Sequence, residues 1–394
     1  MIKASMIENN TYTCLFDVIK KSLWNTGNAY ANQEIFQEMR MHGLIALPAS
    51  VIRDLSLTNE LLDDWKKAII SQVRGYCVYT EAQASLPITV PYVILKGTEA
   101  AKYYPYPEYR AMGDIDIMTQ REDFETACDM LISAGYEELN NGELRHREFI
   151  KNGIIIEVHR YFASLNDPRQ AEYLDDLIIE NINPSHVLPD MVNGLVLLEH
   201  ISQHLEHGLG LRQILDWMMF VNECLPDQKW PEFREMAQNI GLEKLAITAT
   251  RMCEIYLSLP DRRWCSNADD NLCEDFMEYV VNAGNFGNKW ENESRAGTKV
   301  LTYSRTPQAA FRLLQKNGLK NWRLAQEHPS LRPLAWIYQA GMYLAKGFGR
   351  KNAASKLKEE FESARNRNAL LDGLGVKQTS KGLAVYKDGK YVKV

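Results

Sequence analysis

The run Asp114-Ile-Asp-Ile-Met118 constrains the fold most, because polar and apolar residues alternate in it with a period of two. Successive side chains of a strand point to opposite faces of its sheet, so this period predicts a half-buried strand. Both aspartates then lie on one face, about 6–7 Å apart along the strand. The chain must therefore fold around a sheet that carries two neighbouring carboxylates on the same face.

A second strand is expected just upstream of the aspartates. Residues 92–95 form a short β-favouring run that ends in the turn Lys96-Gly97-Thr98. A short helix can follow at residues 98–104, until the prolines of Pro105-Tyr-Pro107 end it and open a loop. The turn offers backbone N–H groups and a helix N-terminus, which together suit a phosphate group.

A helix and two further strands are expected downstream. Residues 121–134 carry an apolar stripe at helical spacing, and Gly135 suits the end of such a helix. Strands are predicted at residues 145–150 and 154–160, joined by a tight turn at 151–153. The sheet that holds the aspartates is therefore small and continuous in sequence.

The rest of the chain has helical patterns on both sides of this core. We therefore predict an α+β fold, with a small mixed-sheet core flanked by N-terminal and C-terminal helical regions. The expected domains are residues 1–88, 89–180 and 181–375, followed by a tail at 376–394 with a hairpin around Asp388-Gly389. Helices are predicted near residues 190–207, 211–224, 230–240, 242–258, 269–283, 307–317, 333–347 and 353–370.

Glu157 lies in the otherwise apolar strand Ile154-Ile-Ile-Glu-Val-His159. A carboxylate in that position is unfavourable unless it is paired or binds a metal ion. Together with Asp114 and Asp116 it could complete a cage for Mg²⁺, or for Mn²⁺ in its place, because these hard cations prefer carboxylate oxygens. Two such ions can serve phosphoryl or nucleotidyl transfer by activating the attacking oxygen and stabilising the leaving one.

Lys96 and Arg110 flank the expected phosphate site. Arginine offers a two-pronged donor and lysine a point charge, so both could hold a triphosphate. The alternative is that they pair with nearby acids such as Glu99 and Glu108. The sequence leaves both interpretations open.

These elements resemble the DNA polymerase β-like nucleotidyltransferase superfamily. More narrowly, residues 35–225 are similar to an uncharacterised bacterial nucleotidyltransferase family. The elements that carry the likeness are Leu95-Lys96-Gly97, Arg110, Gly113-Asp114-Ile115-Asp116, Glu157-Val158-His159, Leu198-Glu-His-Ile-Ser-Gln-His204, His207-Gly208, Leu211-Arg212 and Asp216-Trp217.

The resemblance implies roles for specific residues. Asp114, Asp116 and Glu157 would bind Mg²⁺, and Gly97 and Thr98 would cradle the phosphates of an NTP. The superfamily turn is usually Gly-Gly or Gly-Ser, where this chain has Gly97-Thr98.

Three histidines lie in the helical part that resembles the family. His200 and His204 are one helical turn apart, and His207 follows. We expect His159, His200, His204, Arg212 and Asp216 to contact substrate, while Arg212 and Asp216 could instead form an ion pair within one helix. Two alternatives stay open for His200 and His204. They could bind zinc, although the sequence lacks the His-Glu-x-x-His motif, or they could be structural residues with satisfied hydrogen bonds.

The net charge of −6 hides an asymmetry. Residues 299–368 contain 14 Lys and Arg against 4 Asp and Glu, a balance of +10 that leaves −16 for the remainder. This basic segment indicates an anionic partner or a solvated helix face. The apolar run at residues 336–345, which basic residues follow, could lie on a membrane surface or could pack its apolar side inward. Nucleic acid is a further option, but no recognised nucleic-acid motif accompanies the segment.

Composition argues against a membrane-spanning protein and against one that disulfides stabilise. No apolar run reaches the roughly 20 residues that span a bilayer, and the N-terminus lacks a signal-peptide pattern, so a cytoplasmic protein is expected. The seven cysteines include no CxxC pair, which argues against a disulfide framework or a zinc knuckle.

Three functions follow from these features. The first is an enzyme that moves a nucleoside monophosphate from an NTP to an unknown acceptor hydroxyl and releases pyrophosphate, with Glu157 or a nearby acid helping to deprotonate the acceptor. The second is a catalytically silent module of the same fold that binds a nucleotide or a protein partner. The third is zinc-dependent hydrolysis through His200 and His204.

Overall fold

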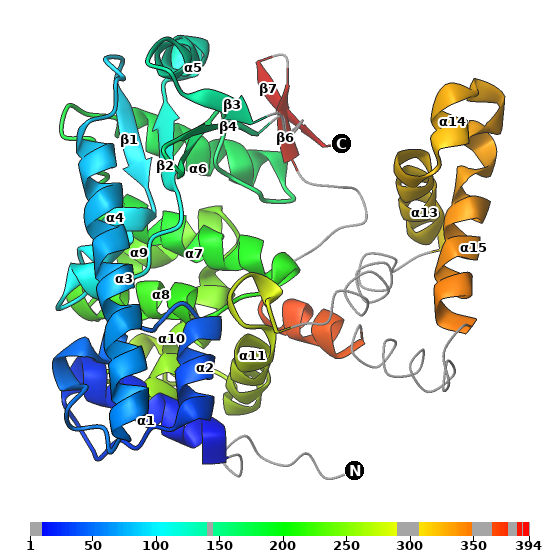
Figure 1. Cartoon of the computed structure of the whole chain (residues 1–394). Helices are drawn as coiled ribbons and strands as arrows, with labels where there is room; N and C mark the ends of the chain where they lie inside the picture. The colour runs from blue at the N-terminus through cyan, green and yellow to red at the C-terminus, as the bar shows by residue number, and fades with distance from the viewer. Residues whose placement is uncertain are drawn as a thin grey trace. The chain divides into compact units, whose positions relative to one another are not determined.

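The computed structural model describes residues 10–139, 145–289, 307–348, 365–376, 384–387 and 389–393. The chain forms two compact units, drawn in Figure 1. The larger comprises Met1–Lys289 and Ala384–Val394, and the smaller comprises Trp290–Leu383. The predicted domain boundaries after residues 88, 180 and 375 stay predictions.

A five-stranded mixed sheet, in the order β1-β2-β5-β4-β3, confirms the α+β prediction. β2 runs parallel to β5, and the other neighbouring pairs are antiparallel. The expected strands are all present, whereas the short edge strand β3 was not predicted because its Glu-Glu-Leu sequence has no strand pattern. The strands are β1 (Tyr92–Leu95), β2 (Ile115–Thr119), β3 (Glu137–Leu139), β4 (His146–Lys151) and β5 (Ile154–His159).

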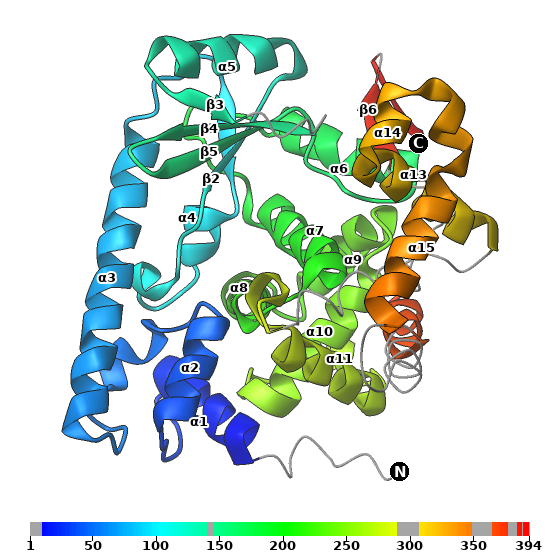
Figure 2. The ribbon, with the colours of Figure 1, turned by 45° about the vertical axis from the view of Figure 1, so that its right-hand side comes forward.

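The two faces of the sheet differ in chemistry. Helix α5 (Phe124–Ser133) lies on one face, as Figure 2 shows, and its apolar stripe packs against the inward side chains of the strands. This core contains Tyr92, Ile94, Ile115, Ile117, Phe124, Ala127, Leu131, Phe149, Ile156 and Val158. The alternate residues of β2, β4 and β5 point to the other face, and these include the acids and histidines of the sequence analysis.

The other helices of the larger unit come before, between and after the strands along the chain. One of them, α6, was missed, although Asp167-Pro168 carries both an N-cap acceptor and a proline at the first helical position. The α-helices are α1 (Asn10–Trp24), α2 (Gln33–Met41), α3 (Asn59–Ala84), α4 (Gly97–Ala101), α6 (Pro168–Glu180), α7 (Asp190–His207), α8 (Leu211–Cys224), α9 (Trp230–Asn239), α10 (Glu243–Leu257) and α11 (Asp270–Ala283). Short 3-10 helices are η2 (Leu47–Val51), η3 (Pro107–Tyr109), η4 (Arg121–Asp123), η5 (Arg263–Cys265) and η6 (Asn285–Gly287).

The end of the chain returns to the larger unit as a hairpin, β6 (Ala384–Lys387) and β7 (Lys390–Lys393). The two strands pair in an antiparallel manner, as the expected hairpin requires, while Asp388 of its turn lies outside the described residues and the tail as a separate domain stays a prediction. The hairpin packs against α6, and the backbone N–H of Ala384 donates to the carbonyl of Leu165 at 3.0 Å.

The smaller unit contains α13 (Pro307–Asn321), α14 (Arg323–Glu327), η7 (Pro329–Leu334) and α15 (Ala335–Phe348). α13 and α15 pack so closely that a Cβ at Gly318 would lie 2.0 Å from the carbonyl oxygen of Ala335. Trp322 stacks on Tyr338 with ring centroids 5.1 Å apart. Of the predicted helix at 353–370, only residues from 365 onward are described, and these are helical.

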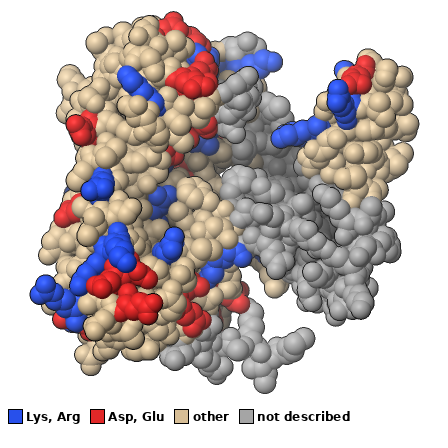
Figure 3. All heavy atoms as spheres, viewed as in Figure 1, with Lys and Arg blue, Asp and Glu red and all other residues tan. Residues whose placement is uncertain are grey.

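The basic segment 299–368 lies partly outside the described residues. Its described part exposes Arg312, Lys316, Lys320, Arg323, Arg332 and Arg365. On the face of the larger unit that Figure 3 shows, basic and acidic side chains are interspersed. No helix among the described residues is long and apolar enough to cross a membrane.

Candidate functional site

Three carboxylates meet on the polar face of the sheet. Asp116 and Glu157 are direct partners in the parallel pairing of β2 and β5. Asp114 directly precedes β2, and one oxygen from each of the three acids lies within 4.8 Å of the other two. The pleat therefore brings together the three acids that the sequence pattern singles out.

Lys96 supplies a cation to this group of acids. Its Nζ lies 2.8 Å from Oδ1 of Asp116, and both side chains are buried. Burial by itself would lower the pKa of Lys96, but the charges of Asp116, Asp114 and Glu157 outweigh it and raise the pKa. Lys96 therefore stays charged beside the carboxylates.

The turn at Lys96 has an unusual backbone. Lys96 has φ +56° and ψ −137°, a conformation that favours glycine, and the following Gly97 has φ +44°. Strain of this kind persists only where surrounding contacts hold it. The Thr98 hydroxyl provides one such contact by donating to Gln83 of α3 at 2.9 Å.

Helix α3 also holds the loop that leads to Asp114. The amide of Gln72 donates to the carbonyl of Tyr109 at 2.7 Å, and the hydroxyl of Tyr79 donates to the carbonyl of Gly113 at 2.6 Å. Gln72, Tyr79 and Gln83 are spaced seven and four residues apart, so they share one face of the helix. This function of α3 was not predicted.

His159 bridges two of the acids. Its Nε2 lies 2.9 Å from Oδ1 of Asp116 and 3.4 Å from Oε2 of Glu157. Burial would raise the pKa of Glu157, but the hydrogen bond and charge of His159, with the charge of Lys96, lower it to about 2. Glu157 is therefore ionised at neutral pH. For Asp114, repulsion from Asp116 and burial raise the pKa instead.

Arg110 pairs with Asp216 rather than with Glu99 or Glu108. Nε and Nη2 of the guanidinium lie 2.7 Å from the two carboxylate oxygens, and Nη1 donates to the carbonyl of Ala111. The hydroxyl of Tyr104 also donates to Asp216, at 2.9 Å. Asp216 thus has its partners outside its own helix, and phosphate binding by Arg110 stays a prediction.

Arg212 has no acidic partner among the ion pairs of the described residues. Nη1 donates to the carbonyl of Ala111 at 3.2 Å, while the buried Nε finds no acceptor among the described atoms. Burial and the charge of Arg110 lower the pKa of Arg212, while the charges of Asp216 and Asp114 act in the opposite direction. Arg212 therefore brings an unneutralised positive charge close to the acids.

His200 and His204 contact each other through their Nε2 atoms at 2.9 Å. Burial, followed by the charges of His204, Lys96 and Arg212, lowers the pKa of His200 well below its usual value. Within the described side chains, no third His, Cys, Asp or Glu completes a metal-ligand set with this pair. The side chain of His207 lies outside the described residues.

Two buried acids were missed by the sequence analysis. Asp175 accepts the backbone N–H groups of Phe162 and Ala163 at 3.0 and 2.9 Å, and Glu199 accepts that of Ser164 at 2.7 Å. Together they fix the loop that follows β5. The only available signal was an acid at an otherwise apolar helix position, which does not reveal its partner.

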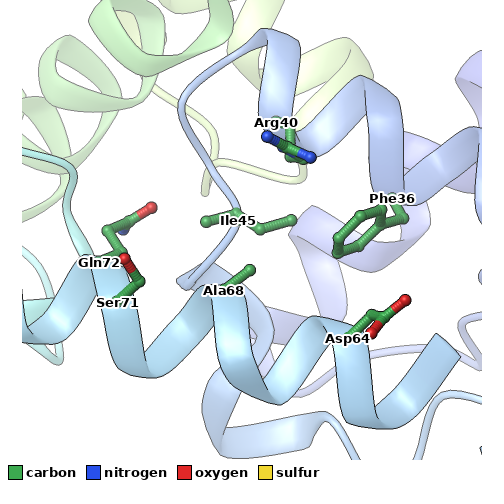
Figure 4. Close-up of a pocket in the computed structure, with 7 residues that line it drawn as sticks. All are labelled: Phe36, Arg40, Ile45, Asp64, Ala68, Ser71 and Gln72. Atoms are coloured by element: carbon green, nitrogen blue, oxygen red, sulfur yellow. The ribbon is translucent and has the colours of Figure 1, made fainter. Parts of the chain in front are cut away.

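A pocket of about 460 Å³ lies elsewhere on the larger unit, as Figure 4 shows. It is lined by Phe36 and Arg40 of α2, by Ile45, and by Asp64, Ala68, Ser71 and Gln72 along one side of α3. None of the predicted site residues lines it.

The carboxylate group suits a hard divalent cation. All three ligands offer oxygen, which Mg²⁺ and Mn²⁺ prefer. Repulsion from Asp116, together with burial, raises the pKa of Asp114 despite the positive charge of Lys96. A bound cation would relieve that repulsion.

Comparison with known proteins agrees with this chemistry. The model of a family described as "uncharacterised nucleotidyltransferase" matches residues 31–258. No curated protein and no solved structure matches the chain. The matched segment contains the polar face of the sheet together with α7 and α8.

Proposed function

Because the chain belongs to this family of uncharacterised nucleotidyltransferases, we propose that it transfers a nucleoside monophosphate from an NTP to an acceptor hydroxyl. The bond between the α-phosphorus and the bridging oxygen breaks, and the acceptor oxygen bonds to that phosphorus. Glu157 or an acid beside it takes the proton of the acceptor hydroxyl, and the oxygen that bridged the α- and β-phosphates leaves with pyrophosphate. We further propose that the core belongs to the DNA polymerase β-like superfamily.

The observation that carries this proposal is the meeting of Asp114, Asp116 and Glu157 within 4.8 Å. These residues would hold Mg²⁺ or Mn²⁺, which supplies Lewis-acid stabilisation of the phosphate charges when bound. The low pKa of Glu157 keeps it in the ionised form that a ligand needs.

The basic residues around the acids would orient the triphosphate. Arg212 is the best placed, because among the described residues its buried Nε has no acceptor and its positive charge has no ion-pair partner. Gly97 and Thr98 would add backbone N–H groups at the start of α4, where the first N–H groups have no partner within the helix. Lys96 would move from Asp116 toward the phosphates.

Arg110 and Asp216 have a different part in this proposal. Their paired charges join the loop before Asp114 to α8, so they position the acids and Arg212 relative to each other. His159 would hold Asp116 and Glu157 in place, while His200 and His204 would face the acceptor.

The test is incorporation of label from an α-³²P-labelled NTP by the purified full chain in Mg²⁺ or Mn²⁺. Asp116→Asn should abolish incorporation, because it removes a ligand without changing the shape of the side chain. Asp129→Asn is the matched control, since Asp129 is exposed on α5 on the other side of the sheet. Nucleotide binding without turnover in the wild type would favour the silent binding module.

A further inference from the structure

A second cluster of metal-binding side chains lies beside the three carboxylates. β4 contributes His146 and Glu148, and β5 contributes Glu157 and His159. In the antiparallel register His146 faces His159, and Glu148 faces Glu157. The sequence patterns His-x-Glu and Glu-x-His therefore place two imidazoles and two carboxylates in a square on one face of the sheet.

The distances in this square suit a small metal ion. Nε2 of His159 lies 3.4 Å from Oε2 of Glu157, and Nε2 of His146 lies 3.9 Å from the same oxygen. One donor atom from each of these three residues lies within 4.8 Å of the others. Metal–ligand bonds of about 2.0–2.1 Å in a tetrahedral site put donor atoms about 3.4 Å apart, so small side-chain movements are enough.

Glu148 would have to turn to act as the fourth ligand, because its donor atoms are not part of this three-residue group. Its Oε1 lies 3.3 Å from Nε2 of His146, and its side chain is 27% exposed, which leaves it room to turn. By contrast, the side chains of His146 and His159 are 10% and 1% exposed, so the two nitrogen donors are held in place.

From this geometry we infer that His146, Glu148, Glu157 and His159 bind a divalent transition-metal ion such as Zn²⁺. Imidazole nitrogen suits zinc and its neighbours in the first transition row, whereas Mg²⁺ prefers oxygen ligands alone. The site shares Glu157 with the group of Asp114, Asp116 and Glu157, and Nε2 of His159, which would bind the ion, lies 2.9 Å from Oδ1 of Asp116 in that group. It does not depend on nucleotidyl transfer.

The test is a calorimetric titration of the chelator-treated full chain with Zn²⁺, in a large excess of Mg²⁺ and without nucleotide. We expect one Zn²⁺ per chain in the wild type. His146→Gln should weaken binding by at least about tenfold, since even the loss of an outer partner of a metal ligand costs 10–100-fold. His328→Gln is the matched control, because His328 is exposed in the smaller unit.

Three further variants locate the ion. Asp114→Asn changes one of the three acids Asp114, Asp116 and Glu157, and His200→Gln changes one member of the His200–His204 pair. Neither Asp114 nor His200 is among the four proposed zinc ligands, so neither variant should affect Zn²⁺ binding. If Zn²⁺ binding is lost in Asp114→Asn and kept in His146→Gln, the inference fails while the proposed nucleotidyl transfer stands. Loss in His200→Gln alone would likewise overturn it. Glu148→Gln, which should weaken binding, provides a second variant if His146→Gln does not fold.

Replacement of zinc by Co²⁺ gives an independent readout. A site with two imidazoles and low coordination number should give strong visible absorption bands, whereas an ion held only by oxygens in six-fold coordination gives weak ones. Weak bands that His146→Gln leaves unchanged would contradict the inference.

Discussion

The guanidinium of Arg110 meets both carboxylate oxygens of Asp216, with Nε–Oδ1 and Nη2–Oδ2 distances of 2.7 Å each. Both side chains are buried, and 106 residues separate them in the chain. The pair therefore joins the loop that leads to Asp114 with helix α8. Such a pair matters most when one member is removed, because the other charge is then buried without a partner.

We predict that Asp216→Asn lowers the free energy of unfolding by about 3–5 kcal/mol, the range expected when a buried ion pair loses one partner. Urea unfolding measures the change. The double variant Arg110→Met with Asp216→Leu should recover part of the loss, since no charge is left unpaired. Glu223→Gln, an exposed position on the same helix, should change stability by less than about 0.5 kcal/mol. A similar loss of unfolding free energy in Asp216→Asn and Glu223→Gln would show that the Arg110–Asp216 pair has no special effect on stability.

We predict that removal of the Lys96 charge changes the affinity of the three acids for Mn²⁺. Its ammonium lies 2.8 Å from Asp116 and competes with a divalent cation for the same oxygen. Lys96→Met should therefore bind Mn²⁺ more tightly, by about tenfold if the competing interaction is worth about 1.4 kcal/mol. Electron paramagnetic resonance of free Mn²⁺ measures the affinity.

Lys67→Met is the control for this experiment, because Lys67 is exposed on α3 and should leave Mn²⁺ binding unchanged. Nucleotidyl transfer by Lys96→Met should fall even though the metal binds better, since the charge that would reach the phosphates is gone. Weaker Mn²⁺ binding in Lys96→Met would show that the ammonium does not compete for the site.

The sheet and its acids could be predicted because their signals are local. Alternation with period two places Asp114 and Asp116 on one side of a strand, and an acid in an apolar strand marks Glu157. The partner of Arg110 could not be predicted in this way. Nearby acids in the sequence, such as Glu108, are as plausible from the sequence alone as Asp216, and only the packing of α8 selects the distant one.

The contacts of the loop after β5 could not be predicted from the sequence either. Asp175 and Glu199 fix its backbone N–H groups from two different helices. Neither helix position has a feature that identifies the loop as its partner. The register of β4 against β5 was likewise needed to bring His146 to His159, because the sequence predicts both strands but not which residues face each other.

We predict that the raised pKa of Asp175 makes the free energy of unfolding depend on pH. Burial, with a contribution from the charge of Glu199, raises its pKa from 3.8 to about 7. The folded protein therefore holds a proton that the unfolded chain releases, and Asp175 lowers stability as the pH rises from about 4 to about 7. Asp175→Asn should lose less stability than the wild type over this interval, as measured by urea unfolding.

Asparagine should keep the contacts of this position. Its carbonyl oxygen can accept the N–H groups of Phe162 and Ala163, and its amide can donate to the hydroxyl of Tyr391, which now donates to Asp175. Asp176→Asn is the neighbouring control, since its side chain is 44% exposed. An equal pH slope in the wild type and Asp175→Asn would exclude Asp175 as the titrating group.

Replacement of Gly194 by alanine tests the packing of α7 against α8, and the same replacement at Gly75 on α3 is its control. Both lie inside helices, where replacement of glycine by alanine normally stabilises by up to about 1 kcal/mol. At Gly75 on α3 the added methyl group would meet no described atom within 4 Å, so Gly75→Ala should be stabilised by this amount. At Gly194 the methyl group would lie 2.2 Å from Cζ of Phe220 on α8.

Phe220 is fully buried and packs against Tyr103, Trp217 and Phe233, so its ring cannot move away without disturbing those neighbours. Overpacking of this kind costs about 1–3 kcal/mol, which exceeds the gain in helix propensity. We therefore predict that Gly194→Ala lowers the urea midpoint while Gly75→Ala raises it. The opposite signs follow from contact alone, because the two substitutions are chemically identical and both helices are long. A higher midpoint for Gly194→Ala would mean that α7 and α8 do not approach as closely as the structure shows.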